Sequence, residues 1–356
     1  MTMRHFYISP LDERYRAPLL EKINNLTKPK GALGRLEEIA LQVGMIQRSL
    51  TPELHKPYNI IFCADHGIVN EGISQSPKEV TWQVVYNILS GGAGVCYLSR
   101  QHGVETLLVD VGVDYEFGSI EGLIDRKIMY GTESYLEGYA MTESQFDRAI
   151  EVGVEMVERA QQEGANIVSF GEMGITNTAA SALWMSILTG MDLRDCVGRG
   201  SGLNDAGLEH KYQILKRALE GYQGSSETID HIRYFGGLEM VAALGGMLRA
   251  AELRMTILVD GFIMTACLLA ARALYPLVGQ YAIFGHQGDE AGHARLLNYL
   301  GAKPLLHLGM RLGEGSGAVC ALPIVHSSVR MLSEMASFAG AGVTKYFDQD
   351  TDETHE

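Results

Sequence analysis

The glutamate at position 314 has the surroundings that most clearly point to chemistry. It lies in the run RLGEGSGA, with glycine on both sides, shortly after the apolar segment PLLHLGM. Burial of a carboxyl group among small neighbours raises its pKa toward neutrality, and such a group can act as a general base. The same position also suits an acid that interacts with the N-terminus of a helix. We expect Glu314 to be a general base and keep the helix-terminus role as the alternative.

Glu172, in the similar run FGEMG, is a second candidate acid, and a helix-terminus role is an equal alternative for it. Glycine lets a ligand approach the backbone closely, and exposed N–H groups at a helix N-terminus favour an anion. Tight turns explain any single glycine cluster equally well. Arg199 and Lys211 are the nearest cations for an acidic ligand, although each also suits an ordinary surface position. The glycine clusters occur at 91–94, 171–174, 198–202, 236–237 and 313–317.

Several histidines and acids are of the types that bind metals. Glu290 and His293 are three residues apart, so a helix would place both on one face. No established zinc spacing such as HExxH occurs, and we expect hydrogen-bonding roles, no metal and no cofactor. A metal-dependent hydrolase that uses His66, His286 and His293 is the last of the alternatives.

Apolar runs typical of buried strands alternate with segments of helical period. This alternation predicts a mostly parallel sheet covered by helices on both faces, an α/β fold. Ligands bind at the carboxyl ends of the strands in such sheets, and four of the runs end in polar or glycine-containing turns there. The strands are expected at 59–67, 104–112, 164–172, 255–261 and 281–286, with helical segments at 77–98 and 143–162.

Both ends of the chain have a helical period instead. Apolar residues recur at helical spacing after the turn-forming segment KPKG (28–31) and again over 321–341. We therefore expect a small helical domain built from residues 1–55 and 320–356, beside a large α/β catalytic domain of residues 56–319.

Composition narrows the function classes. The 356 residues include 29 basic and 43 acidic side chains, a net charge of −14 that disfavours a nucleic-acid partner. The longest apolar run, 261–271, is too short to span a membrane. Five scattered cysteines without a CxxC pair indicate free thiols, and the first residues have no secretory signal. We expect a cytoplasmic protein.

Seven motifs in order along the chain resemble the family of nicotinate-nucleotide–dimethylbenzimidazole phosphoribosyltransferases. They cover nearly the whole sequence, which is far more specific than any single glycine motif. They are LTKPKGALGRLEEIA (26–40), ADHGIVNEGISQSPKEVTWQVV (64–85), GEMGITNT (171–178), GRGSGLNDAGLEHK (198–211), GGLEM (236–240), VDGF (259–262) and KPLLHLGMRLGEGSGA (303–318).

The resemblance implies an enzyme of cobalamin biosynthesis that prepares the lower ligand of cobamides. It would move the 5-phosphoribosyl group of nicotinate mononucleotide to 5,6-dimethylbenzimidazole or a similar base, with inversion, giving an α-ribotide and nicotinate. The implied fold is a Rossmann-like three-layer α/β domain with a small helical domain formed by both termini. The implied assembly is a homodimer, with a heterodimer of two similar subunits as the alternative.

The resemblance also assigns roles to individual residues. Glu314 would be the general base. The donor's ribose phosphate and nicotinate would be held by Glu172, Gly174, Gly200 and Lys211, with Asp260 and Gly261 nearby. The acceptor pocket would be lined by Ser76, Gln83, Met173, Leu312 and the 286–290 turn, including Gly288.

Some positions depart from the family pattern. The family usually has glycine at Thr176, threonine at Ala179, a hydroxyl residue at Gly288 and aspartate at His307. The missing hydroxyl at Gly288 motivates a phenol or p-cresol acceptor, used by a heterodimer, as the second hypothesis. A non-catalytic partner subunit is the third, and the presence of Glu314 argues against it.

Overall fold

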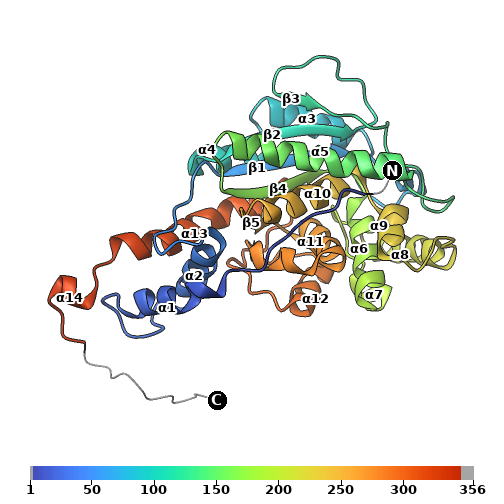
Figure 1. Ribbon diagram of the computed structural model, residues 1–356. Coiled ribbons are helices and arrows are strands. Elements are labelled where there is room, and N and C mark those ends of the chain that lie inside the picture. The colour runs from blue at the N-terminus through green and yellow to red at the C-terminus, as the bar shows by residue number, and fades with distance from the viewer. Residues whose placement is uncertain (1–2, 346–356) are drawn as a thin grey trace. The chain divides into compact units, whose positions relative to one another are not determined.

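The structure is a computed structural model that describes residues 3–345, and its larger unit is an α/β fold with one parallel sheet (Figure 1). All five neighbouring strand pairs are parallel, in the order β3-β2-β1-β4-β5-β6. The fold class predicted from the sequence is therefore confirmed. The strands are β1 (Tyr58–Ala64), β2 (Glu105–Gly112), β3 (Leu123–Asp125), β4 (Ile167–Met173), β5 (Thr256–Val259) and β6 (Ala282–Phe284).

The five predicted strands are all present, and β3 is the one that the sequence analysis missed. Every residue of β1 is buried, as expected for a parallel strand covered on both faces. By contrast, β3 has three residues, pairs only with β2 at the sheet edge and is partly exposed. A strand this short and exposed leaves no continuous apolar run in the sequence.

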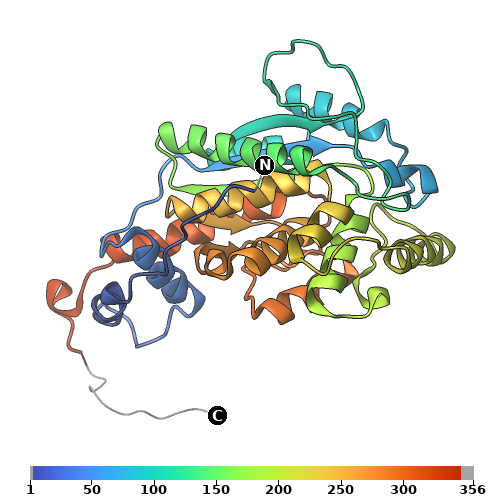
Figure 2. The ribbon, with the colours of Figure 1, turned by 45° about the vertical axis from the view of Figure 1, so that its right-hand side comes forward.

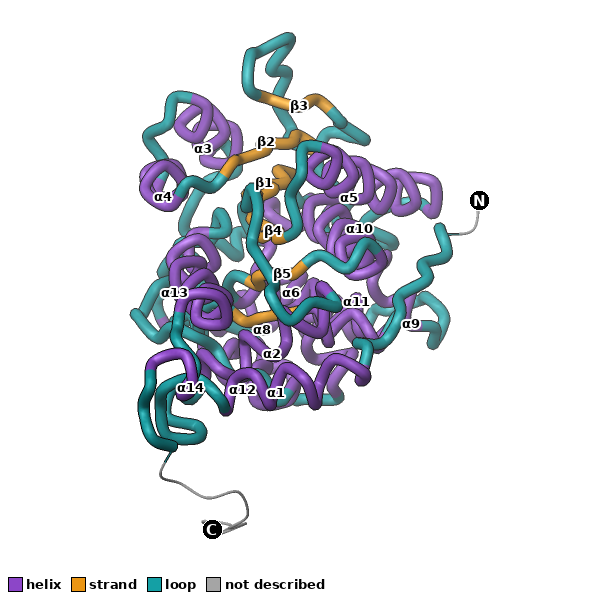
Figure 3. Tube along the Cα trace, turned by 60° about the vertical axis from the view of Figure 1, so that its left-hand side comes forward, coloured by secondary structure: helices purple, strands orange, loops and turns teal. Residues whose placement is uncertain are grey.

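Helices cover both faces of the sheet. Helices α5 and α10 lie on one face, whereas α3 and α4 lie on the other (Figure 3). Where α5 crosses α10, a Cβ added at Gly153 would lie 1.9 Å from the carbonyl oxygen of Ala242, so the close contact requires glycine. The first face carries α5 (Glu143–Gln162) and α10 (Leu238–Glu252), and the other carries α3 (Val80–Leu89) and α4 (Gly94–His102) (Figure 3).

The predicted helical segment 77–98 is two helices, because the chain turns between α3 and α4. Gly91 there has a φ of +75°, in the left-handed region that glycine adopts most easily. The segment 143–162 is the single helix α5, whose N-terminus has a capping box between Thr142 and Gln145. The other helices of the larger unit are α6 (Asn177–Thr189), α7 (Leu193–Cys196), α8 (Asp205–Glu220), α9 (Thr228–Phe235), α11 (Phe262–Leu274) and α12 (Ala291–Leu300), with 3₁₀ turns η2 (Gly67–Glu71) and η3 (Pro276–Tyr281).

A second compact unit contains residues 11–54 and the described part of the chain from 323 onward. Its core joins apolar side chains from both segments, including Leu19, Ile23, Met45 and Met331. Its elements are η1 (Glu13–Tyr15), α1 (Arg16–Asn24), α2 (Arg35–Gln47), the C-terminal part of α13 (Ser316–Glu334) and α14 (Phe338–Ala341).

Residues 3–10, which the sequence analysis assigned to the small helical domain, group instead with the larger unit of residues 55–322. The N-terminal segment lies across the helices of that unit (Figures 1 and 2). The backbone N–H of Tyr7 donates to Glu252 Oε1 at 2.8 Å, and Tyr281 donates its hydroxyl to the Ser9 carbonyl at 2.7 Å. Among residues 3–345, no helix is long and apolar enough to cross a membrane.

Candidate active site

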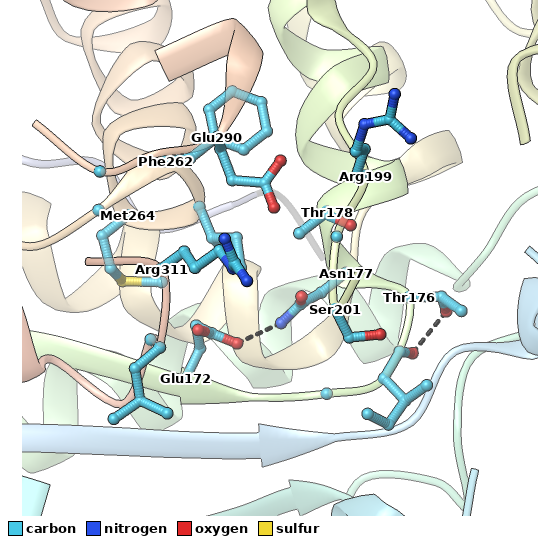
Figure 4. Close-up of a pocket in the computed structure, with 18 of the residues that line it drawn as sticks. Glu172, Thr176, Asn177, Thr178, Arg199, Ser201, Phe262, Met264, Glu290 and Arg311 are labelled. Carbon is cyan, nitrogen blue, oxygen red and sulfur yellow. Dashed lines mark hydrogen bonds between the residues drawn. The ribbon is translucent and has the colours of Figure 1, made fainter. Parts of the chain in front are cut away.

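A cavity of about 180 Å³ lies where β4, β5 and β6 end (Figure 4). Its walls come from the segments that follow these strands, from the 199–201 loop and from α8, which is where a parallel sheet places a ligand site. The residues that line it are Ile73, Ser74, 172–178, 199–201, Lys211, 260–264, His286, 288–290 and 310–313.

The structure brings together nine of the predicted substrate-binding residues at this cavity. They are Glu172, Met173, Gly174, Gly200, Lys211, Asp260, Gly261, Gly288 and Leu312. Ser76 is not part of the lining, although Ile73 and Ser74 just before it are. Gln83 is also absent from the lining, because it is an exposed residue of α3, whose buried face carries Thr81, Val85 and Ile88 instead.

Glu314 directly follows the lining residues Leu312 and Gly313, and only 6% of it is exposed. Its Oε2 accepts a hydrogen bond of 3.1 Å from the backbone N–H of Val95, in the first turn of α4. Burial raises the pKa of Glu314, and the hydrogen bond from Val95 opposes that rise. The position therefore combines both sequence interpretations, since the buried acid also lies at the N-terminus of a helix.

The two glycines beside Glu314 are required by close packing against the sheet. Residues 313, 314 and 315 all have positive φ, +89°, +62° and +83°. A Cβ at Gly313 would lie 2.5 Å from Glu172 Oε1, and one at Gly315 would lie 2.2 Å from Asn59 Oδ1. Asn59 in turn donates from Nδ2 to the Glu314 carbonyl at 2.8 Å. Strand β1 thus fixes the backbone that presents the candidate base.

Glu172 lies at the end of β4 and is buried among other acids. Burial, together with the carboxylates of Glu239, Asp260 and Glu314, raises its pKa to about 8, against a hydrogen bond from the Asn177 side chain. The labelled side chains in Figure 4 show this bond at the floor of the cavity. Glu172 is therefore protonated at neutral pH and can donate a hydrogen bond to a ligand.

Lys211 of α8 is the buried cation of the cavity, 1% exposed. Its Nζ donates to Thr178 Oγ1 at 2.8 Å and to the Gly198 carbonyl at 3.2 Å. Burial lowers its pKa to about 8, against the pull of the Glu290 carboxylate. Arg199, the other predicted cation, forms an ion pair with Asp205 through its guanidinium group. Lys211 is thus the better placed of the two for an anionic ligand.

His66 and His293 make hydrogen bonds within the protein, and His286 lies beside a carboxylate. His66 Nε2 lies 2.7 Å from Glu239 Oε1, and both side chains are fully buried behind Gly174. His293 Nδ1 accepts from the Gly288 N–H at 2.8 Å, and burial lowers the pKa of His293 to about 3. His286 Nε2 lies 3.5 Å from Asp260 Oδ1. Across residues 3–345 no group of three or more His, Cys, Asp or Glu is arranged to hold a metal ion.

Sequence reasoning missed some residues of the cavity. Thr178 was part of a quoted motif, GEMGITNT, yet received no role, although a hydroxyl beside a lysine suits an anion. Thr176 has a φ of +80°, a left-handed conformation that β-branched residues rarely adopt. Glu239 could not be identified as a partner of His66, because 173 residues separate the two in the chain.

Comparison with known proteins gives one consistent picture. The profile of a family described as phosphoribosyltransferase matches residues 8–343. A Bacteroides fragilis protein named nicotinate-nucleotide–dimethylbenzimidazole phosphoribosyltransferase is 59% identical over 345 residues, covering 97% of this chain and all of the relative. A Parabacteroides distasonis protein of the same name is 58% identical over 346 residues, with the same coverage. The crystal structure of CobT from Thermus thermophilus superposes with a TM-score of 0.90 at 38% identity, covering 94% of this chain and 100% of that one.

Proposed function

The chain belongs to the phosphoribosyltransferase family, and on that premise we propose that it transfers the 5-phosphoribosyl group of nicotinate mononucleotide to dimethylbenzimidazole. The products would be an α-ribotide, which serves cobalamin biosynthesis, and nicotinate. One observation supports this most directly: a buried lysine lines the cavity beside a glycine loop, and the buried Glu314 directly follows Leu312 and Gly313 of the same lining. Such a site can hold an anionic donor and also accept a proton.

The donor nucleotide is anionic, and the residues for it lie along one side of the cavity. Lys211 and the N–H of Gly200 would bind an anionic group of the donor, with Thr178 beside them. Glu172, protonated at neutral pH, would donate a hydrogen bond to an oxygen of the ribose or of the nicotinate. Gly174, Asp260 and Gly261 would complete this side. These contacts would hold the anomeric carbon of the ribose in place while nicotinate leaves.

Glu314 would take the acceptor's proton. As a ring nitrogen of dimethylbenzimidazole attacks C1′, the bond from C1′ to the nicotinate nitrogen breaks, and its electron pair leaves with nicotinate. The acceptor becomes positively charged unless it loses its N–H proton, and a carboxylate with a raised pKa is a suitable base for it. Attack opposite to the leaving group inverts C1′, which gives the α-ribotide from the β-nucleotide. Met173, Leu312 and Gly288 would contact the acceptor.

The alternatives have less support. The Bacteroides fragilis and Parabacteroides distasonis relatives both carry the dimethylbenzimidazole name, which favours that acceptor over a phenol or p-cresol. Glu314 is buried and hydrogen-bonded beside the cavity, as a catalytic subunit requires and a non-catalytic partner does not. We further propose, from the family resemblance, that the enzyme works as a cytoplasmic homodimer, which its mass in solution would test.

Product analysis tests the function. The purified chain would be incubated alone with nicotinate mononucleotide and an equimolar mixture of dimethylbenzimidazole, adenine, phenol and p-cresol, and the products identified by mass spectrometry. We expect dimethylbenzimidazole α-ribotide and free nicotinate. A phenolic riboside phosphate would support the second acceptor hypothesis instead. A folded protein that forms no riboside phosphate would contradict the proposed activity of the lone chain.

A further inference from the structure

Three groups converge on one corner of the cavity to form what we call the anion cradle: the backbone N–H of Gly200, the ammonium of Lys211 and the hydroxyl of Thr178. A Cβ added at Gly200 would lie 3.2 Å from Thr178 Oγ1 and 3.7 Å from Lys211 Nζ, so the three residues are immediate neighbours. Lys211 also donates directly to Thr178. All three belong to the wall of the cavity.

The carboxylate of Glu290 lies beside this anion cradle, in the wall of the same cavity and against Gly198, whose carbonyl accepts from Lys211. Burial raises the pKa of Glu290, whereas the charge of Lys211 and the N–H of Gly200 oppose that rise by favouring the carboxylate. The fit is tight, because a Cβ at Gly198 would lie 2.0 Å from Glu290 Oε2. In Figure 4 the side chain enters the cavity from the start of α12 and points toward Thr178.

The position of Glu290 on its own helix makes this orientation notable. It is the N-cap residue of α12, yet its side chain makes no capping hydrogen bond. A side-chain oxygen at an N-cap commonly accepts an N–H of the first helical turn. Glu290 leaves that interaction unmade and places its charge beside the anion cradle instead.

We propose that Glu290 is an internal substitute for the donor's anionic group, which lies at the anion cradle in the free enzyme and must leave it before the donor binds. This inference rests on the proposed function, since it assigns the anion cradle to an anionic group of nicotinate mononucleotide. Two anions cannot share one N–H and one ammonium without strong repulsion. Only the fraction of molecules in which Glu290 has withdrawn can bind, and the apparent association constant is the intrinsic one multiplied by that fraction.

Binding measurements without acceptor test the proposal. Glu290→Gln keeps the shape and removes the charge, whereas Glu290→Ala also vacates the anion cradle. We expect Glu290→Ala to lower the Kd for nicotinate mononucleotide by about tenfold or more, as a lost hydrogen bond to a charged group implies, and Glu290→Gln to lower it less. Glu209→Gln, an exposed acid on the same helix as Lys211, is the matched control and should leave Kd unchanged.

Two truncated ligands identify which anion the cradle receives. Nicotinamide mononucleotide keeps the phosphate and lacks the carboxylate, and nicotinate riboside has the reverse. If the phosphate binds in the anion cradle, Glu290→Ala should lower the Kd of nicotinamide mononucleotide only. If the carboxylate binds there, Glu290→Ala should lower the Kd of nicotinate riboside only. Either result supports the proposal.

Unchanged or weaker binding of both ligands to folded Glu290→Gln and Glu290→Ala would overturn it, because Glu290 would then merely balance Lys211 or contact the donor. Sulfate, titrated by calorimetry, separates this from failure of the proposed function. If Glu290→Ala binds sulfate more tightly than the wild type does, but the wild type shows no transferase activity, the proposed function is rejected. The proposal that Glu290 competes with anions for the cradle then still holds.

Discussion

The Oε2 atom of Glu314 accepts a hydrogen bond of 3.1 Å from the backbone N–H of Val95. This bond joins the loop before α13 to the first turn of α4, across 219 residues of sequence. It directs the carboxylate and favours its charged form, whereas burial favours the neutral form. The candidate base is thus held by the N-terminus of α4, a helix that is distant from it in the sequence.

Glu314→Gln should lower kcat by about 10² to 10⁴, the range typical of a removed general base, with little change in KM for the donor. The amide oxygen can still accept from Val95, so the thermal unfolding temperature should hardly change. Glu137→Gln, an exposed acid, is the control. Steady-state rates that match the wild type would remove Glu314 from the role of base.

Replacing Lys211 by methionine should raise the Kd for nicotinate mononucleotide. In the wild type the affinity should also fall as pH rises through about 8, because burial lowers the pKa of Lys211 to about 8 and only the charged form attracts the anion. Titrations from pH 6.5 to 9.5 would measure both effects. An alkaline loss of affinity that persists in Lys211→Met would assign it to another group.

Glu172→Gln should change how stability depends on pH. The pKa of Glu172 is about 8 in the folded protein, against an ordinary value of 4.5, so this group stabilises the fold below pH 4.5 and that contribution is lost as pH rises toward 8. The free energy of unfolding of the variant, relative to the wild type, should therefore increase by about 1.4 kcal/mol per pH unit over this window.

Denaturant unfolding at pH 5, 6, 7 and 8 measures this difference, and groups common to both proteins cancel. Parallel curves for the wild type and Glu172→Gln would mean that Glu172 has an ordinary pKa in the folded state.

Thr176→Gly should stabilise the fold by about 1 kcal/mol, because it relieves a left-handed backbone at a β-branched residue. Glycine is also the residue usual in the family there. Thr189→Gly is the control and should destabilise by about 1 kcal/mol or more, because Thr189 ends α6 and its hydroxyl hydrogen-bonds the Met185 carbonyl and the Met191 N–H. Equal losses at both positions would show that Thr176 is not strained.

The candidate site was predictable where its residues carry a local signal. Glu172, Gly200 and Glu314 each lie in a glycine-rich run, Lys211 follows the run at 198–202, and the family motifs pass through all four. Ser76 and Gln83 were predicted from the family resemblance alone. Gln83 is exposed, because α3 buries a different face. A motif gives the order of residues along the chain but not the rotation of a helix.

By itself, the sequence determined the parallel α/β architecture, because long buried strands leave continuous apolar runs and helices leave a period near 3.6. It also determined where the glycines and acids of the site had to occur. Tertiary structure alone decided the partners: Val95 for Glu314, Glu239 for His66, and Thr178 for Lys211. The physical reason is that an apolar pattern specifies which residues are buried, whereas a polar contact depends on which distant segments the fold brings together.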